Sequence, residues 1–325
     1  MTIHIGIIGT GSFARLHASI VNEMEDVVIR GVCGRSLEKA EQIAKDYPQA
    51  KAYNELTKML DNEQIDAAYI CVPPFAHGEI EELLVERGIP FFVEKPLSTN
   101  IEIPTTILNK IKEKQLLTSV GYHFRYLHGT RKAKELLQDC TIGMAIGYWM
   151  GTMPEVSWWR KNETSGGQFV EQTTHIVDLV RYVLGEVEEV RADFAKRMQP
   201  AKAEINVSDV GTVTLKMSSG AIVTIHNTCI LPIDYQNGLD VYTDRGILRL
   251  NQQGLQEVNQ DEIRDYSNDS SVSPYEKESQ AFIHAVRTSD SSQILSTYED
   301  AWKTQQVAIA ANQSAELGQS IKLAK

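Results

Sequence analysis

The chain has 325 residues, which suggests roughly two domains, and 42% of them are hydrophobic, enough for a full core. A formal net charge of −11 at pH 7 argues against a nucleic-acid backbone or an anionic membrane as partner. The four cysteines form no CxxC pair, so we expect a reduced, cytoplasmic protein without disulfides or a metal site.

In residues 1–121, short apolar runs alternate with amphipathic stretches. The predicted strands are His4–Ile8, Val27–Cys33, Ala67–Val72, Pro90–Val93 and Leu117–Gly121. The predicted helices are Phe13–Glu25, Leu37–Asp46, Glu55–Leu60, His77–Arg87 and Pro104–Lys114. Apolar strands that alternate with helices indicate an α/β domain with a doubly wound parallel sheet.

A glycine loop joins the first predicted strand to the first predicted helix. It consists of Gly9, Thr10, Gly11, Ser12, Phe13 and Ala14. Gly9 permits a tight turn, Gly11 lets a pyrophosphate approach the backbone, and Ala14 allows close packing of helix and strand. A surface turn can carry the same pattern, but its place after the first strand predicts a dinucleotide site and therefore a Rossmann domain.

The end of the second predicted strand bears on the choice of cofactor. An NAD site usually has Asp or Glu there to hold the ribose diol. This chain has Arg35 and Ser36 instead, and its first acid is Glu38. Arg35 and Ser36 can hold a 2′-phosphate, which favours NADP over NAD. If Arg35 only stacks on the adenine, both cofactors bind.

Glu94, Lys95 and Pro96 follow a predicted strand at the carboxyl end of the sheet, where open α/β proteins bind ligands. A lysine there can donate a proton or hydrogen bond to a substrate oxygen. An ordinary surface lysine could also follow a strand, but the proline stiffens the turn and restricts where Lys95 points.

Residues 122–325 show longer alternating runs joined by short turns. The predicted strands are Met144–Met150, Val187–Lys196, Gly211–Met217, Ala221–Cys229, Leu239–Thr243 and Ile247–Leu250. Helices are predicted at Leu127–Leu137, Tyr275–Thr288 and Tyr298–Leu317, and a surface loop at Gln252–Pro274. This pattern predicts an α+β domain with an open, mostly antiparallel sheet. The last helices can pack either within this domain or back on residues 1–121.

After Gly166 and Gly167, the spacing predicts one helix that ends near Gly185. Glu171 and His175 would lie one above the other on it, four residues apart. An acid and a histidine within hydrogen-bond reach can act as a general acid/base pair, although a helix with one incidental histidine has the same pattern. The remaining histidines have no ligand-type partners at metal-site spacing, so we interpret them as structural or exposed: His4, His17, His128, His226 and His284.

Four segments occur in an order that resembles the Gfo/Idh/MocA family of oxidoreductases. They are the glycine loop, the turn Val72-Pro73-Pro74 with His77, the segment Glu94-Lys95-Pro96, and the Gly-Gly…His-x-x-Asp helix. That family includes glucose–fructose oxidoreductase and inositol dehydrogenase, and the resemblance covers essentially the whole chain. It implies an NAD(P)-dependent dehydrogenase of sugars, sugar derivatives, cyclitols or related diols.

The resemblance also implies roles for individual residues. Lys95 matches the catalytic lysine, His175 matches the histidine that exchanges the hydroxyl proton, and Glu171 stands where many members have Asp. Asp178 fits the His-x-x-Asp pattern, or it only stabilises the helix or a neighbouring arginine. Residues implied to contact the cofactor, besides the glycine loop and Arg35–Ser36, are Val72, Pro73, His77, Glu94, Lys95, Trp159 and Arg160. Residues implied to contact the substrate are Lys95, Tyr122, His123, Arg125, Arg160, Glu171 and His175.

Two other functions share this fold: NAD-dependent glycoside cleavage without net redox, and a cofactor-sensing regulator without catalysis. We also expect a homodimer or homotetramer, because the open sheet of residues 122–325 needs a partner against its free face.

Overall fold

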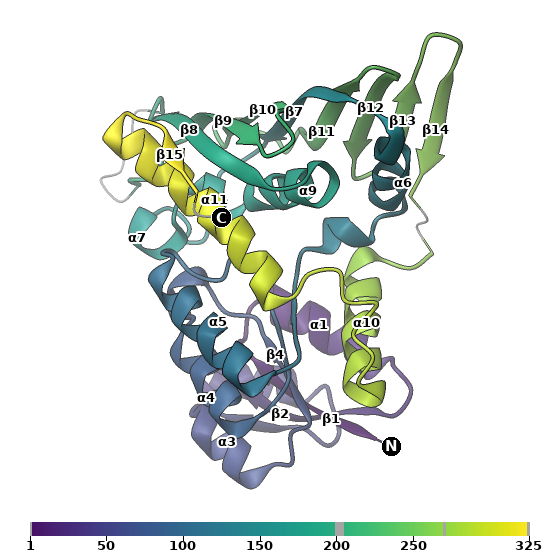
Figure 1. Ribbon diagram of the computed structural model, residues 1–325. Coiled ribbons are helices and arrows are strands. Elements are labelled where there is room, and N and C mark those ends of the chain that lie inside the picture. Colours follow the sequence, from purple (N-terminus) through teal and green to yellow (C-terminus); the bar gives the residue numbers. More distant parts are fainter. Residues whose placement is uncertain (1, 199–204, 269–270, 324–325) are drawn as a thin grey trace. The chain divides into compact units, whose positions relative to one another are not determined.

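The computed structural model describes residues 2–198, 205–268 and 271–323, and the chain forms two compact units (Figure 1). Unit 1 contains the chain up to Ser98, Glu102–His123 and Val272–Trp302, and unit 2 contains Thr99–Ile101, Phe124–Ser271 and the chain from Lys303 onward. Within the described ranges, no helix is both long and apolar enough to cross a bilayer. The division at residue 121 into cofactor-binding and substrate-binding parts stays a prediction.

Unit 1 contains a six-stranded sheet in the order β3-β2-β1-β4-β5-β6, and every neighbouring pair is parallel. The strands are β1 Ile3–Ile8, β2 Val27–Cys33, β3 Lys51–Tyr53, β4 Ala67–Ile70, β5 Phe91–Val93 and β6 Thr118–Val120. This order is that of a Rossmann sheet and confirms the predicted fold. The sequence did not predict β3, because this edge strand has three residues and none is fully buried.

Helices cover both faces of this sheet, because alternate strand residues point to opposite sides. On one face, Ile5, Ile7 and Tyr69 pack against α1 (Ser12–Asn22), α2 (Leu37–Ala44) and α10 (Pro274–Thr288). On the other face, Ile8, Ile70 and Phe91 pack against α3 (Leu56–Asn62), α4 (Glu79–Arg87) and α5 (Glu102–Lys114). The sheet is therefore doubly wound, and α10, from late in the chain, completes one of its faces.

Unit 2 contains a nine-stranded sheet in the order β14-β13-β12-β11-β7-β10-β9-β8-β15. The strands are β7 Ile142–Met150, β8 Val187–Ala195, β9 Val210–Met217, β10 Ile222–Thr228, β11 Gln236–Thr243, β12 Gly246–Asn251, β13 Gly254–Val258, β14 Ile263–Ser267 and β15 Ile321–Lys322. β7 and β10 are parallel and the other neighbours are antiparallel, so the predicted mostly antiparallel sheet is confirmed.

One face of this sheet packs against α6 (His128–Leu136), α9 (Thr174–Leu184) and the later part of α11 (Tyr298–Leu317) (Figure 1). Ile176 of α9 lies so near β7 that a Cβ at Gly147 would be 2.6 Å from its side chain. Glycine at this position thus lets α9 approach the sheet closely. The remaining short helices are η1 Pro74–Ala76, η2 His123–Tyr126, η3 Leu137–Asp139, α7 Asn162–Ser165 and α8 Gln168–Glu171.

The surface loop predicted at Gln252–Pro274 is wrong, because this segment contains the hairpin β13–β14. Polar pairs across the two strands support the hairpin: Tyr266 donates a hydrogen bond to Glu257, and Gln256 donates one to Asp265. The Asn259 side chain accepts from two backbone N–H groups in the turn. The same Asp and Asn residues that indicated a loop therefore build a solvated edge of the sheet.

Candidate cofactor and catalytic sites

The glycine loop places backbone where a phosphate group can approach it. Gly9 has φ +123°, and a Cβ there would lie 2.1 Å from the carbonyl oxygen of Cys71, so this position requires glycine. Gly11 has an ordinary φ of −83°, and a Cβ there would meet nothing within 4 Å. Glycine at position 11 is therefore not needed for the fold but leaves space beside the backbone.

The N-terminus of α1 opens directly after this loop. Gly11 is its N-cap, no side chain caps the helix, and its first turn contains no acidic residue. The free N–H groups and the positive end of the helix dipole favour an anion at this position. Ala14 is fully buried against the sheet, as predicted, while Phe13 is partly exposed. Loop and helix together fit the pyrophosphate of a dinucleotide.

The end of β2 carries Arg35 and Ser36. The Arg35 guanidinium lies 5.6 Å from the centre of the Phe75 ring, a cation–π arrangement. The Ser36 hydroxyl accepts a hydrogen bond from the Lys39 N–H at 3.3 Å and so caps α2. Arg35 remains exposed on its other side, and no carboxylate precedes Glu38 after the strand.

The turn after β4 holds Val72, Pro73 and His77. His77 is buried, and its Nδ1 lies 2.5 Å from Oε1 of the buried Glu81. The second oxygen of Glu81 accepts from the Gly78 N–H at 2.7 Å, which caps α4. Glu81 thus fixes both the imidazole and the start of the helix. Sequence analysis missed Glu81, although its spacing of four residues from His77 is the signal that could have found it.

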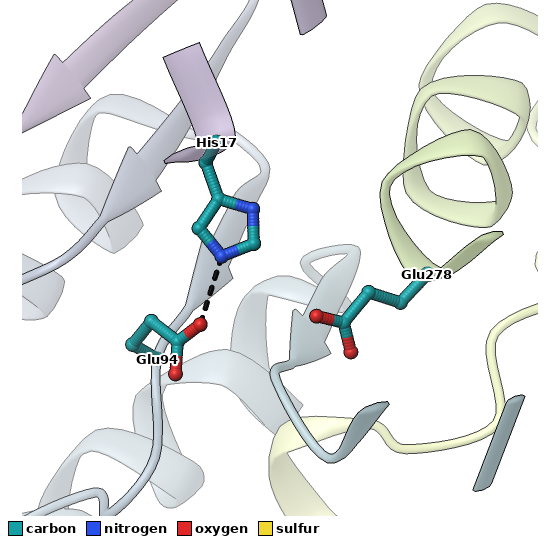
Figure 2. Close-up of side chains that lie close together, drawn as sticks. All are labelled: His17, Glu94 and Glu278. Carbon is teal, nitrogen blue, oxygen red and sulfur yellow. Dashed lines mark hydrogen bonds and ion pairs between the residues drawn. The ribbon is translucent and has the colours of Figure 1, made fainter. Parts of the chain in front are cut away.

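Glu94 and Lys95 follow β5. Glu94 is buried, and its Oε1 lies 2.8 Å from Nε2 of the fully buried His17 of α1 (Figure 2). A Cβ at Gly121, beside the neighbouring strand, would be 3.0 Å from the same carboxylate. Lys95 is partly exposed, and its peptide bond to Pro96 is cis. His17 is buried and has an acidic partner, Glu94, which its sequence neighbours did not indicate because Glu94 lies 77 residues away.

Tyr122 and His123 follow β6 and are both buried. The His123 ring stacks on Tyr275 with 4.2 Å between ring centres. Burial lowers the pKa of His123 from its ordinary value of 6.5 to about 3, and the positive charges of Lys95 and His17 act in the same direction. The His123 imidazole is therefore neutral at physiological pH.

The single helix predicted from Gly167 to Gly185 is wrong, because the chain forms α8 and α9 with a break at Gln172–Thr173. The Thr173 N–H donates to the Gln168 carbonyl, and the His175 N–H donates to the Gln172 carbonyl, so the regular i→i−4 pattern is interrupted. The Gln168 side chain ties α8 to the end of β10 through Thr228 and Asn227.

Glu171 and His175 consequently lie on different helices. Oε2 of Glu171 accepts a hydrogen bond from the indole N–H of the buried Trp159 at 2.7 Å. His175, at the start of α9, is buried between the rings of Phe124 and Trp149, whose centres lie 5.2 Å and 5.8 Å from it. Arg160, next to Trp159, donates from Nε to the Pro154 carbonyl.

Arg125 and Asp178 form a buried, two-pronged ion pair. Nε and Nη2 of Arg125 lie 2.7 Å and 2.6 Å from the two oxygens of Asp178, and both side chains are almost completely buried. The Thr304 hydroxyl donates a further hydrogen bond to Asp178. Asp178 therefore binds a neighbouring arginine, as one of the predicted alternatives had it. That arginine is Arg125, a predicted substrate contact.

Comparisons with known proteins show the family to which the chain belongs. Residues 3–122 match the model of an oxidoreductase family with an NAD-binding Rossmann fold, and residues 130–249 match the GFO/IDH/MocA C-terminal domain. The fold and the matched domains define a nicotinamide-dependent dehydrogenase. The chain belongs to the Gfo/Idh/MocA family of oxidoreductases.

Several relatives are named inositol dehydrogenases. The chain is 25% identical to a myo-inositol 2-dehydrogenase of Thermotoga maritima over 75% of its length and 74% of the relative's. It is 26% identical to an inositol 2-dehydrogenase/D-chiro-inositol 3-dehydrogenase of Lacticaseibacillus casei over 89% and 86% of the two chains. A solved levoglucosan dehydrogenase in complex with NADH and levoglucosan has the same fold, with TM-score 0.87 and 16% identity over both whole chains.

Proposed function

We propose that this chain catalyses the reversible oxidation of a secondary alcohol of a sugar, sugar derivative, cyclitol or related diol to a ketone. The observation that carries the proposal is the open backbone at Gly11, in front of the uncapped N-terminus of α1, on the same parallel sheet that holds Lys95 at the end of β5. The inositol dehydrogenases among the relatives support the substrate class.

A bound nicotinamide supplies the hydride acceptor or donor. In the proposed reaction, Lys95 donates a hydrogen bond to the reacting oxygen and stabilises its developing negative charge. His175 takes up or returns the hydroxyl proton. Glu171, held by the Trp159 indole, helps to orient the substrate and His175. The proposed substrate contacts also include Tyr122, His123, Arg125 and Arg160. The proposed cofactor contacts also include Val72, Pro73, His77, Glu94, Trp159 and Arg160.

Replacing Gly11 with alanine tests the dinucleotide site. We expect the Kd for the cofactor to rise about tenfold or more, because the new methyl group occupies the space a pyrophosphate needs. The melting temperature should change little, since that methyl group meets no protein atom within 4 Å. Nicotinamide fluorescence titration and thermal unfolding measure the two effects. Gly143→Ala is the matched control, because this exposed glycine of β7 has no positive φ and its new Cβ would meet its nearest atom at an ordinary 3.7 Å. Unchanged cofactor affinity in Gly11→Ala would contradict the site.

NADP is the favoured cofactor in this proposal. We expect NADPH to bind more tightly than NADH, and Arg35→Ala to weaken NADPH binding by about tenfold while changing NADH binding little, because the guanidinium would contact only the 2′-phosphate. Arg87→Ala, which removes an exposed arginine of α4, is the matched control. Equal losses for both cofactors would indicate adenine stacking, and tighter NADH binding would overturn the preference.

Chemistry without net redox is the second candidate. One relative, 26% identical over 58% of this chain, is named 2,7-anhydro-N-acetylneuraminate hydratase. Accumulation of NADPH or NADH during turnover separates the two candidates, because a cofactor that is recycled within each cycle does not accumulate. The expected homodimer or homotetramer also stays a proposal.

A further inference from the structure

Three buried ionisable side chains meet in unit 1 on the α1/α10 side of the sheet: His17 of α1, Glu94 after β5 and Glu278 of α10 (Figure 2). Their ligand-type atoms lie within 4.8 Å of one another. His17 and Glu278 have no exposed surface and Glu94 is 5% exposed. Glu94 and His17 are hydrogen-bonded to each other. Neither Glu278 oxygen has a hydrogen-bond partner among the described residues.

The groups that face Glu278 offer it no free positive charge. Across from it lie Glu94 and His17, and the His17 imidazole is already engaged by Glu94, with Ser279 at 3.4 Å from its other nitrogen. The other titratable side chains that interact with Glu278 are Tyr69 of β4, Cys71 just after β4 and Tyr275 of α10, and none of them is a cation. Two ionised carboxylates beside one imidazole would leave an uncompensated buried charge, which is very unfavourable.

We propose that Glu278 is a neutral, protonated carboxylic acid in the folded protein, and that it is a positioning residue which holds Glu94, the neighbour of Lys95, from the α10 side. Burial and the Glu94 charge raise the pKa of Glu278 well above its ordinary value of 4.5, in agreement with this assignment. A buried acid usually neutralises itself in this way rather than stay ionised without a partner. The 2.8 Å contact between His17 and Glu94 has the length of a direct hydrogen bond, whereas two ligands of one cation would both turn toward the ion.

The neutral acid has a consequence for catalysis, which rests on the proposed role of Lys95. Glu94 is held by His17 on one side, lies against Gly121 and faces the Glu278 side chain. A neutral Glu278 fills the α10 side of this cluster without adding a second buried negative charge beside Glu94. Glu278 thereby helps to fix the backbone from which the Lys95 side chain extends.

Equilibrium unfolding of wild type and Glu278→Gln across pH tests the proton. Because the pKa of Glu278 is raised in the folded state, its protonation stabilises the wild type fully below pH 4.5, and this stabilisation is lost as pH rises toward the folded-state pKa. Gln carries no such proton. We expect the unfolding constant of wild type, relative to Glu278→Gln, to rise about tenfold per pH unit in this window. Glu276→Gln, on the same helix, is the matched control for removing a carboxylate from α10. A ratio that does not change with pH would overturn the proposal.

Two further readouts separate protonation from other roles. Infrared spectra of the wild type at neutral pH should show the C=O stretch of a protonated carboxylic acid, which is lost in Glu278→Gln; absence of this band in wild type overturns the proposal even if the variant fails to fold. The third outcome is that the purified protein contains stoichiometric metal and that a chelator removes the stability that depends on Glu278. Glu278 would then be a metal ligand, and the proposal of a neutral acid would be overturned.

Turnover tests the positioning role separately. Glu278→Ala should lower kcat about tenfold with little change in the cofactor Kd, because it removes the side chain that packs beside Glu94. Glu278→Gln should restore kcat, because the amide has nearly the same size as the neutral acid and, like it, carries no charge. Equal kcat values in all three proteins would overturn the positioning role. The unfolding and infrared results need no turnover, so they stand even if Lys95 is not catalytic.

Discussion

We expect Lys95→Met and His175→Gln each to lower kcat about 10²–10⁴-fold, the range for loss of a positioned acid or base. Met retains the length of the lysine side chain but has no proton to donate. Gln at position 175 retains a polar side chain of similar size between Phe124 and Trp149 but cannot exchange a proton near neutral pH. Steady-state kinetics with a sugar and polyol panel, and fluorescence titration with the preferred cofactor, measure kcat and Kd separately.

Two exposed residues supply matched controls: Lys39→Met and His128→Gln make the same chemical changes on the surface. We expect wild-type kcat in both controls and a cofactor Kd near wild type in all four variants. Near-full activity in Lys95→Met or His175→Gln would show that the assigned role is wrong. A large rise in the cofactor Kd, with kcat unchanged at saturation, would assign the residue to cofactor binding instead.

We expect Asp178→Asn to destabilise the protein by about 3–5 kcal/mol, because it removes the negative charge that the buried Arg125 guanidinium contacts. Both side chains are at most 3% exposed, so water cannot replace the lost carboxylate. The free energy of unfolding from urea titration, with an unchanged m value, measures this effect.

Asp61→Asn is the matched control for this ion pair. Asp61 and Arg87 also make a contact of 2.6 Å, but their side chains are 52% and 40% exposed. A surface pair of this kind contributes only about 0–1 kcal/mol, so the control should stay within that range. Similar losses in the two variants would mean that burial does not decide the strength of the Arg125–Asp178 pair. The double variant Arg125→Met/Asp178→Leu should recover part of the stability, because it removes both charges together.

The sequence predicted those parts of the fold in which local pattern and tertiary packing agree. The apolar runs of β1, β2 and β4 are buried on both faces, and the glycine loop turns where Gly9 must adopt a positive φ. A continuous apolar run is the sequence signature of a strand that is buried on both faces, so the pattern predicted these strands. The hairpin β13–β14 lacked such a signature, since most of its side chains are polar and at least partly exposed.

The break between α8 and α9 shows a different limit. Nothing in the apolar spacing of residues 167–185 indicates it, because the cause is a tertiary contact: Gln168 is tied to the end of β10, about 60 residues further on. Tertiary contacts also explain why only one member of each buried pair, Glu94–His17 and Asp178–Arg125, could be assigned to a motif. Glu94, His175 and Asp178 stand in recognisable motifs, whereas their partners His17 and Arg125 come from other elements of the chain.

The discontinuity of unit 1 has a consequence for synthesis in the cell. Phe282 and Ile283 of α10 pack on the first sheet, yet they leave the ribosome long after β6 has been made. At a synthesis rate of about 5–20 residues per second, the part of this face that α1 and α2 leave uncovered stays exposed for many seconds before α10 arrives. Chaperones that bind exposed apolar surface should associate with the chain until α10 has been made. In a fragment that ends near residue 121, α10 is absent and the same surface would stay exposed.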